Sequence, residues 1–338
     1  MIEIVPRKTI LVAGGAGFVG SHLCEALLRR GHRVLCLDSF LTGTSENVLP
    51  LCQHADFRLI RKCVTEDVVL REPVDQVYNL ASPASPPHYQ ADPVHTMMTN
   101  VVGTAKLLAL AAEHGARFVQ ASTSEVYGDP EVHPQPEGYA GNVSCTGPRA
   151  CYDEGKRAAE ALCYDFVRAG RVDVRVARIF NTYGPRMRAD DGRIVSNMIV
   201  QALTGVPMTI YGTGEQTRSF CYVSDLVAGL LALMAVDPAP EGPVNLGNPE
   251  EFSVLELAER VRGLIPTRSE IVFRPLPKDD PRRRRPDIAR ARALLGWAPK
   301  LTLAEGLLAT IKWFAGAVGQ ANVPAPAPKR KAAAGAAG

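Results

Sequence analysis

Over the first half of the chain, short runs of apolar residues alternate with longer stretches in which apolar positions recur every three or four residues. The short runs predict buried strands at residues 9–13, 33–37, 76–80, 117–121 and 173–179. The longer stretches predict helices at residues 21–30, 96–113 and 150–169. Strands alternating with helices indicate βαβ units with right-handed crossovers. The expected fold is therefore α/β, a Rossmann-like doubly wound parallel sheet.

The pattern loosens after about residue 180, where loops rich in Gly, Pro and Arg separate expected helices at residues 195–204, 224–236 and 253–264. This change predicts a smaller C-terminal lobe that binds substrate. We divide the chain into a dinucleotide-binding domain at residues 1–180, a region at 181–316 that is mainly this lobe, and a tail at 317–338. Residues 322–338 are almost entirely Ala, Pro, Lys and Gly, a composition that predicts disorder.

Composition narrows the class of protein. With 46% apolar and 22% charged residues, the chain has the amino-acid composition of an ordinary globular protein. The net charge of +3 comes from two local runs, residues 282–285 and 329–331, which does not fit a broad nucleic-acid-binding surface. Eight cysteines without metal-ligand spacing predict reduced thiols, no metal site and a cytoplasmic location. No apolar run approaches the ~18–20 residues of a membrane span.

A glycine-rich loop follows the first expected strand. Gly14, Gly17 and Gly20 lie between that strand and the next helix, where glycine permits a tight turn and a close approach to a pyrophosphate. Asp38 ends the following strand, where a carboxylate can accept hydrogen bonds from ribose hydroxyls and repel a 2′-phosphate. We therefore predict a dinucleotide site that prefers NAD to NADP.

Two further groups of residues indicate catalysis. Tyr152 and Lys156 are four residues apart on an expected helix and so share one face. A nearby ammonium is expected to lower the tyrosine pKa and make Tyr152 a general base. Thr123 and Glu125 follow a strand end, the edge of a parallel sheet where ligands bind.

These motifs together carry a resemblance. The glycine loop, residues 121–128 (ASTSEVYG) and the Tyr152–Lys156 pair resemble the extended short-chain dehydrogenase/reductase superfamily. More narrowly, the sequence is similar to the UDP-glucuronate decarboxylases (UDP-xylose synthases) over about residues 9–316. This similarity rests on five segments: 80–87 (LASPASPP), 147–156 (GPRACYDEGK), 178–186 (RIFNTYGPR), 191–193 (DGR) and 245–249 (NLGNP).

The resemblance implies a closed redox cycle on UDP-glucuronate. NAD oxidises C4, the 4-keto acid loses CO₂, and the same cofactor reduces C4 again to give UDP-xylose. It implies that Thr123 binds the O4 hydroxyl and Glu125 assists at the carboxylate. Lys156 would hold the nicotinamide ribose, and Arg284 would bind the carboxylate and then stabilise the enolate.

The resemblance also implies which residues bind the ligands, and a homodimer that forms through the helices at 96–113 and 150–169. The implied cofactor-binding residues are Gly14, Gly17, Phe18, Val19, Gly20, Asp38, Ser39, Thr42, Gly43, Val64, Leu80, Ser82, Thr99, Tyr152, Lys156 and Thr182. The implied substrate-binding residues are Pro87, Tyr89, Glu125, Asn181, Arg186, Arg193, Tyr211, Gln216, Arg218 and Arg284. Cys63 stands where relatives have an Asp beside adenine, and Asp67 is a candidate to replace it.

Alternatives remain open from the sequence. A UDP-glucuronate or UDP-galactose 4-epimerase would keep Tyr152 and Lys156, but is not expected to share Arg284 in this context. A catalytically silent NAD-binding regulator would keep the glycines and tend to lose Thr123, Tyr152 or Lys156, all of which are present.

Overall fold

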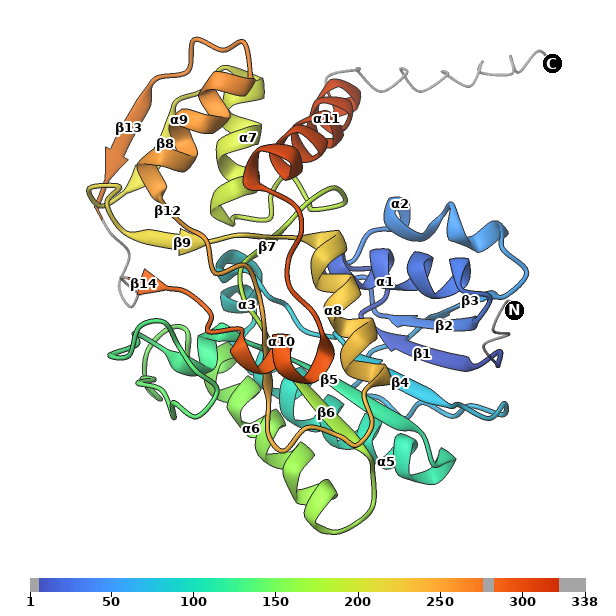
Figure 1. The fold of residues 1–338 in the computed structure, drawn as a ribbon. Coiled ribbons are helices and arrows are strands. Elements are labelled where there is room, and N and C mark those ends of the chain that lie inside the picture. Colours follow the sequence, from blue (N-terminus) through green and yellow to red (C-terminus); the bar gives the residue numbers. More distant parts are fainter. Residues whose placement is uncertain (1–5, 276–282, 322–338) are drawn as a thin grey trace, which may run out of the picture.

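A computed structural model describes residues 6–275 and 283–321. Its main feature is a seven-stranded parallel sheet with the order β11-β6-β5-β4-β1-β2-β3 (Figure 1). The chain direction across the sheet reverses at β1, the place where open α/β sheets bind ligands. The predicted fold class is confirmed. The strands of this sheet are β1 (Thr9–Ala13), β2 (Arg33–Asp38), β3 (Phe57–Arg61), β4 (Gln76–Asn79), β5 (Arg117–Thr123), β6 (Val174–Ile179) and β11 (Val244–Leu246).

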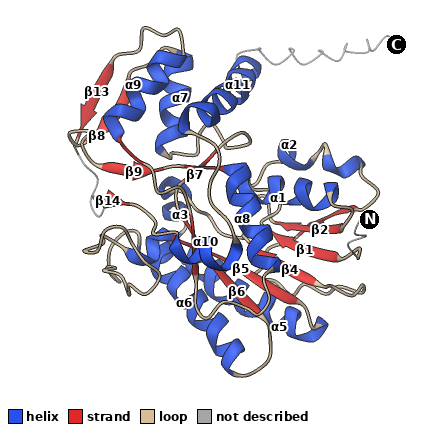
Figure 2. Ribbon diagram, in the orientation of Figure 1, coloured by secondary structure: helices blue, strands red, loops and turns tan. Residues whose placement is uncertain are grey.

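Helices cover both faces of the sheet (Figure 2). On one face, α1 (Phe18–Arg29) and α8 (Val223–Ala235) bury leucines in a single apolar cluster with β1 and β2. On the other face, α5 (Thr104–His114) and α6 (Ala150–Arg168) share a second cluster with β4 and β5. Gly115 ends α5 in a left-handed conformation with φ 63°, which a residue without Cβ adopts at little cost.

A smaller lobe has its own core, visible in Figure 1 around α7, α9 and α11. The lobe contains α7 (Ile194–Thr204), α9 (Val254–Leu264) and α11 (Leu303–Ala321), and the parallel pair β8 (Met208–Tyr211) and β13 (Ile271–Arg274). Ser253 begins α9 as a side-chain cap that accepts from the Glu256 N–H. Met198, Leu257 and Phe314 are fully buried here, so the three helices are held together by apolar packing.

Short elements join the two parts. They form a pair of β7 (Thr182–Tyr183) with β10 (Cys221–Tyr222), and a three-stranded sheet of β12 (Glu251–Ser253), β9 (Thr217–Ser219) and β14 (Arg283–Arg284). The remaining helices are α2 (Ser45–Val48), α3 (Pro86–Ala91), α4 (Pro93–Met98) and α10 (Ala289–Leu295), with the short turns η1 (Leu51–Gln53), η2 (Thr99–Gly103) and η3 (Ser124–Tyr127).

The structure departs from the sequence predictions in several places. The single helix expected at 96–113 is divided into α4, a π-helical turn η2 and α5. Segments expected to be loops contain β7, β9 and β14, and β11 joins the main sheet although it follows residue 180. Helix α11 continues to Ala321, past the expected start of the tail at 317. The rest of that tail, and Arg282, lie outside the described residues.

Within residues 6–275 and 283–321, no helix has both the length and the apolar character needed to span a bilayer.

Candidate active site

The glycine-rich loop joins β1 to α1 and forms part of a cavity of about 590 Å³. Gly14 has φ +76° and packs so closely that an added Cβ would lie 2.7 Å from the Leu80 carbonyl carbon. An added Cβ on Gly20 would lie 2.1 Å from the Gly14 carbonyl oxygen. Gly17, Phe18, Val19 and Gly20 all line this cavity, so the N-terminus of α1 faces it with its free N–H groups.

Asp38 ends β2 beside this loop. Its Oδ2 accepts from the Ala16 N–H at 2.9 Å, and its Oδ1 accepts from the Phe40 N–H at 2.8 Å. Burial raises the pKa of Asp38, and these backbone hydrogen bonds oppose the shift. Gly43 does not line a cavity itself. It gives room to Asp38, because a Cβ there would lie 2.9 Å from Oδ1.

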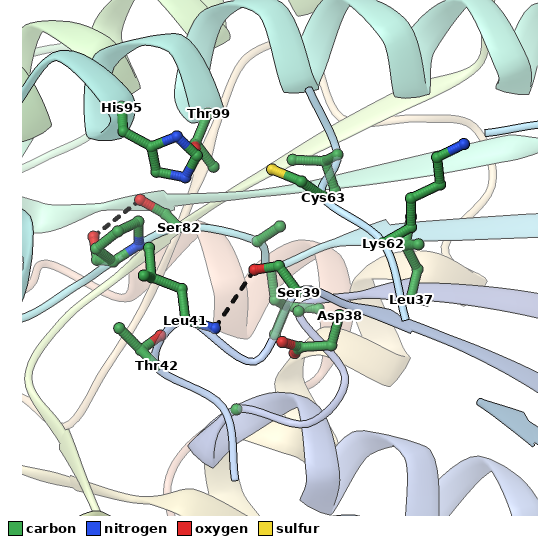
Figure 3. Close-up of a pocket in the computed structure, with 16 residues that line it drawn as sticks. Leu37, Asp38, Ser39, Leu41, Thr42, Lys62, Cys63, Ser82, His95 and Thr99 are labelled. Carbon is green, nitrogen blue, oxygen red and sulfur yellow. Dashed lines mark hydrogen bonds between the residues drawn. The ribbon is translucent and has the colours of Figure 1, made fainter. Parts of the chain in front are cut away.

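A smaller cavity of about 70 Å³ lies at this end of the site (Figure 3). Asp38, Ser39 and Thr42 lie across from His95 and Thr99 in this view. The Thr99 hydroxyl is buried and has no hydrogen-bond partner among the described residues. Of the residues expected to bind cofactor, nine line this cavity: Gly14, Gly17, Asp38, Ser39, Thr42, Val64, Leu80, Ser82 and Thr99.

Asp67 is the open candidate to replace the adenine contact at Cys63. The Asp67 side chain is 88% exposed, is paired with Lys106 at 2.6 Å and does not line the cavity. Cys63 does line it, and its Sγ accepts from the Thr65 hydroxyl at 3.1 Å. Lys62 is a lining residue that the sequence did not indicate, because nothing in its neighbourhood along the chain marks it.

Tyr152 and Lys156 lie on the same face of α6, as expected, and both line the larger cavity. The Lys156 Nζ lies 5.8 Å from the centre of the Tyr152 ring and donates to the Ala121 carbonyl oxygen at 2.9 Å. Tyr152 also stacks on Tyr89, with ring centres 5.1 Å apart.

The pKa of Tyr152 differs from expectation. Burial raises it above its usual value, and a hydrogen bond with Thr123 opposes the shift. The expected lowering is therefore wrong for this arrangement. Burial also lowers the pKa of Lys156 to about 8.

Glu125 and Arg284 form a bidentate ion pair, although they are 159 residues apart in the chain. β14 brings Arg284 there by pairing in parallel with β9, so that Arg284 lies opposite Arg218. Arg149 donates to the same carboxylate at 2.7 Å. Burial would raise the pKa of Glu125, but Arg284 and Arg149 outweigh it and lower the pKa to about 2. Glu125 is therefore ionised at neutral pH.

Tyr89 lies on α3 and lines the larger cavity. It is 1% exposed, and its hydroxyl has no hydrogen-bond partner within the described part of the chain. Burial raises its pKa. A buried phenol without a partner can donate to a ligand. Pro87, on the same helix, also lines the larger cavity.

Six of the residues expected to bind substrate line the same large cavity: Asn181, Arg186, Arg193, Tyr211, Gln216 and Arg218. Thr182, which is expected to bind the cofactor, lines it too. Arg193 is held by both oxygens of Asp191, at 2.5 and 2.8 Å. Arg186 is paired with Glu25 and has φ +68°. Arg218 is 8% exposed, so it is not a solvated surface charge. The structure therefore brings together all of the expected site residues except Gly43 as cavity-lining groups.

Sequence reasoning missed Arg149 and Asp153. Both lie inside the segment 147–156 that carried the resemblance, but spacing alone did not assign them a partner. Asp153 is 6% exposed, and burial and the nearby Glu125 raise its pKa to about 7.

Among the residues that the structure describes, no three His, Cys, Asp or Glu side chains are grouped so as to hold a metal ion.

Comparison with known proteins agrees with this geometry. The model of the NAD dependent epimerase/dehydratase family matches residues 10–247. The chain belongs to this family. Within it, the chain is 56% identical over 308 residues to UDP-glucuronic acid decarboxylase 1 of Danio rerio, covering 91% of this chain and 73% of that protein. It is 56% identical over 301 residues to UDP-glucuronic acid decarboxylase 1 of Arabidopsis thaliana, covering 89% and 68%.

Solved structures of the family share the fold but differ in activity. UDP-glucuronic acid 4-epimerase from Bacillus cereus, in complex with UDP-glucuronic acid and NAD, matches with a TM-score of 0.81 at 28% identity, covering 91% of this chain and 99% of that one. DesIV, a dTDP-glucose 4,6-dehydratase from Streptomyces venezuelae, matches with a TM-score of 0.84 at 26% identity, covering 92% and 98%. The fold alone therefore does not choose among activities, whereas the relatives above 50% identity confirm the resemblance predicted from the motifs.

Proposed function

We propose that this protein is a UDP-glucuronate decarboxylase that forms UDP-xylose and CO₂. Relatives with that name match most of the chain at 56% identity. The observation in the structure that carries the proposal is the cavity in which Arg284 meets Glu125, close to Tyr152 and Thr123. A guanidinium at that place suits a substrate that brings its own carboxylate.

The cofactor is NAD, held by the loop of Gly14, Gly17 and Gly20 and by Asp38. The fit rests on the glycine cradle, on the N-terminus of α1 and on the buried Thr99 hydroxyl without a partner among the described residues. When bound, NAD supplies the acceptor and later the donor of a hydride. Asp38 disfavours a 2′-phosphate by charge repulsion.

Proton transfer at the sugar C4 hydroxyl belongs to Tyr152. Thr123 hydrogen-bonds Tyr152 and opposes the rise of its pKa, so it supports the phenolate that accepts the proton. Lys156 is fixed by the Ala121 carbonyl oxygen on the same face of α6 and orients the cofactor ribose. After oxidation at C4, the acid is a β-keto acid, which loses CO₂ because the carbanion is delocalised as an enolate.

Arg284 and Tyr89 bind the sugar carboxylate, and Glu125 assists at this end. At the other end, Arg186, Arg193 and Arg218 provide positive charge for the diphosphate of UDP. Asn181, Tyr211 and Gln216 supply hydrogen bonds there. Pro87 lines the same cavity and supplies apolar contact. The substrate is then held at both ends, with C4 between them at Tyr152.

The deciding experiment is incubation of the purified protein with UDP-glucuronate and a catalytic amount of NAD⁺, followed by separation of nucleotide sugars and measurement of CO₂. UDP-xylose with an equal amount of CO₂ supports the proposal. UDP-galacturonate with all carbon retained would favour a 4-epimerase instead. NAD binding without any conversion would favour a silent regulator.

The homodimer, the cytoplasmic location and the division at residue 180 stay predictions. Support for the dimer comes from apolar side chains left exposed near α4 and α6: Val94 is 72%, Met98 46% and Val167 42% exposed. Light scattering on the purified protein measures its mass directly. A mass of one chain at micromolar concentration would refute the dimer.

A further inference from the structure

Four consecutive arginines, residues 282–285, precede Pro286, and the fold brings one of them, Arg284, to Glu125. A run of identical side chains does not by itself define which member enters a site. Successive side chains of a strand point to opposite faces, so a shift of β14 by one residue would turn Arg284 away from Glu125. A shift by two residues would bring another arginine of the run there. The register of this segment must therefore be fixed by other contacts.

β9 provides one set of these contacts. β14 pairs with it in parallel over only two residues, and the Ser219 hydroxyl donates to the Arg284 carbonyl oxygen at 3.2 Å. The Arg284 side chain is 4% exposed and the Arg285 side chain 41%, in agreement with alternation along a strand. Pro286 comes next, and its nitrogen carries no hydrogen to donate. A ladder of two residues followed by a proline offers few hydrogen bonds that resist slippage.

Gln135, in the loop between η3 and α6, provides a second set. Its backbone N–H donates to the Arg285 carbonyl oxygen at 2.9 Å, and its side-chain Oε1 accepts from the Arg285 N–H at 2.8 Å. Its carbonyl oxygen accepts from the Asp287 N–H at 3.0 Å. Its Nε2 donates to the Val132 carbonyl oxygen at 2.8 Å, which orients the side-chain amide. Gln135 is fully buried, so its hydrogen bonds are made within the protein.

We propose that Gln135 is a positioning residue that fixes the register of the arginine run, so that Arg284 reaches Glu125 and the carboxylate of UDP-glucuronate. The part that concerns the substrate rests on the proposed function. Gln135 lines neither of the two cavities, so it acts through β14 and not by contact with a ligand. Loss of its side-chain amide leaves the Arg285 N–H without its acceptor, which favours a shift of the segment.

The shift is expected to affect the acidic sugar selectively. A displaced β14 withdraws the Arg284 guanidinium from the place of the sugar carboxylate. UDP-glucose carries the same nucleotide but no carboxylate, so it gains no ion pair from Arg284 in either register. A role of Gln135 in stability alone would weaken both ligands to the same extent.

The test measures affinity in the absence of turnover. In a Tyr152→Phe background loaded with NAD, UDP-glucuronate and UDP-glucose are titrated separately by calorimetry. We expect Gln135→Met, which keeps the size of the side chain, to weaken UDP-glucuronate at least about tenfold, or about 1.4 kcal/mol. The affinity for UDP-glucose should change less than about twofold. Arg284→Met is expected to weaken UDP-glucuronate at least as much, and adding Gln135→Met to it should change that affinity less than about twofold.

Asp225→Ala is the matched control. The Asp225 carboxylate likewise accepts from backbone N–H groups of a distant segment, at Lys300 and Leu301, but the residue lines neither cavity. This variant should change neither affinity, although it also removes a buried tether.

Equal weakening of both ligands by Gln135→Met, no change in either, or additive losses in the double variant would overturn the inference. If Gln135→Met does not fold, Gln135→Asn decides, because its amide is one methylene shorter. The ratio of the two affinities must then fall severalfold, and an unchanged ratio counts against the role. Conversion of UDP-glucuronate by the unsubstituted protein is measured separately. Failure there with a selective loss in Gln135→Met refutes the proposed function and keeps the role of Gln135, whereas normal conversion with an unchanged ratio refutes that role alone.

Discussion

The ion pair between Glu160 and Arg178 links β6 to α6, the helix that also carries Tyr152 and Lys156. Arg178 donates to the two Glu160 oxygens at 3.0 and 2.8 Å, and the Ser122 hydroxyl donates to Oε1 at 2.5 Å. Arg178 also donates to the Tyr127 hydroxyl at 3.0 Å. The pair is well shielded, since the two side chains are 13% and 10% exposed. We expect Glu160→Ala to destabilise the protein strongly, because it leaves Arg178 without its counter-charge.

The magnitude follows from this burial. Removal of one partner from a fully buried pair costs about 3–5 kcal/mol of unfolding free energy. Because both side chains of this pair keep some exposure, we expect the lower value, about 3 kcal/mol. At about 2.1 cal/mol/K of unfolding entropy per residue, a chain of 338 residues shifts by roughly 1.4 °C per kcal/mol, so the midpoint of thermal unfolding falls by about 4 °C. Glu154→Ala is the matched control, since Glu154 lies on the same helix and pairs with Arg157 at 3.5 Å in a more exposed place. We expect that control to cost less than about 0.5 kcal/mol.

Urea unfolding followed by tryptophan fluorescence measures both variants. The double variant Glu160→Ala with Arg178→Met should be more stable than Glu160→Ala alone, because it removes the stranded guanidinium. If the two alanine variants agree within about 0.5 kcal/mol, or if Arg178→Met adds its own full cost, the buried pair does not hold β6 to α6 as described.

Three further outcomes are expected. Gly20→Ala places a Cβ 2.1 Å from the Gly14 carbonyl oxygen, so NAD affinity measured by fluorescence should fall more than about tenfold, and unchanged affinity would contradict the role of the loop. Asp153 has a pKa of about 7 in the folded protein against a usual 3.8, so its contribution to stability is present at low pH and is lost as the pH rises through 7. Unfolding free energies from pH 4.5 to 8 should therefore fall for the unsubstituted protein relative to Asp153→Asn, and parallel profiles would refute this. Arg284→Ala should lower CO₂ release by about a hundredfold or more, and release at the unsubstituted rate would remove Arg284 from the mechanism.

Local patterns predicted the parts of the site that depend on neighbours in the sequence. The glycine loop, Asp38 and the Tyr152–Lys156 face follow from turn geometry and helix periodicity, and each lies where those rules put it. The π-helical turn η2 was not predictable in this way, because its residues read as ordinary helix. Short strands such as β9 and β14 were also missed, since each has few residues and forms only by pairing, β9 with β12 and β14, and β14 with β9.

Electrostatic properties were the least predictable from sequence. The expected effect of Lys156 on Tyr152 assumed that proximity outweighs burial, whereas desolvation dominates both groups. The sequence left open whether Asp67 reaches the cavity, because its pairing with Lys106 is visible only in the folded structure. Arg149 acts on a residue that lies 24 positions earlier in the chain, a relation that only the folded structure reveals.

The pairing of β14 with β9 also has a consequence for the synthesis of the protein. Residues for the cofactor loop, Thr123 and Tyr152 leave the ribosome well before Arg284, which reaches Glu125 across 159 positions of chain. A nascent chain that stops before β14 would hold the residues proposed for oxidation but not the guanidinium proposed to bind the carboxylate. The guanidinium at Glu125 is thus added after the other groups of the cavity, and chains shortened to before β14 also lack α11 and with it part of the core of the smaller lobe.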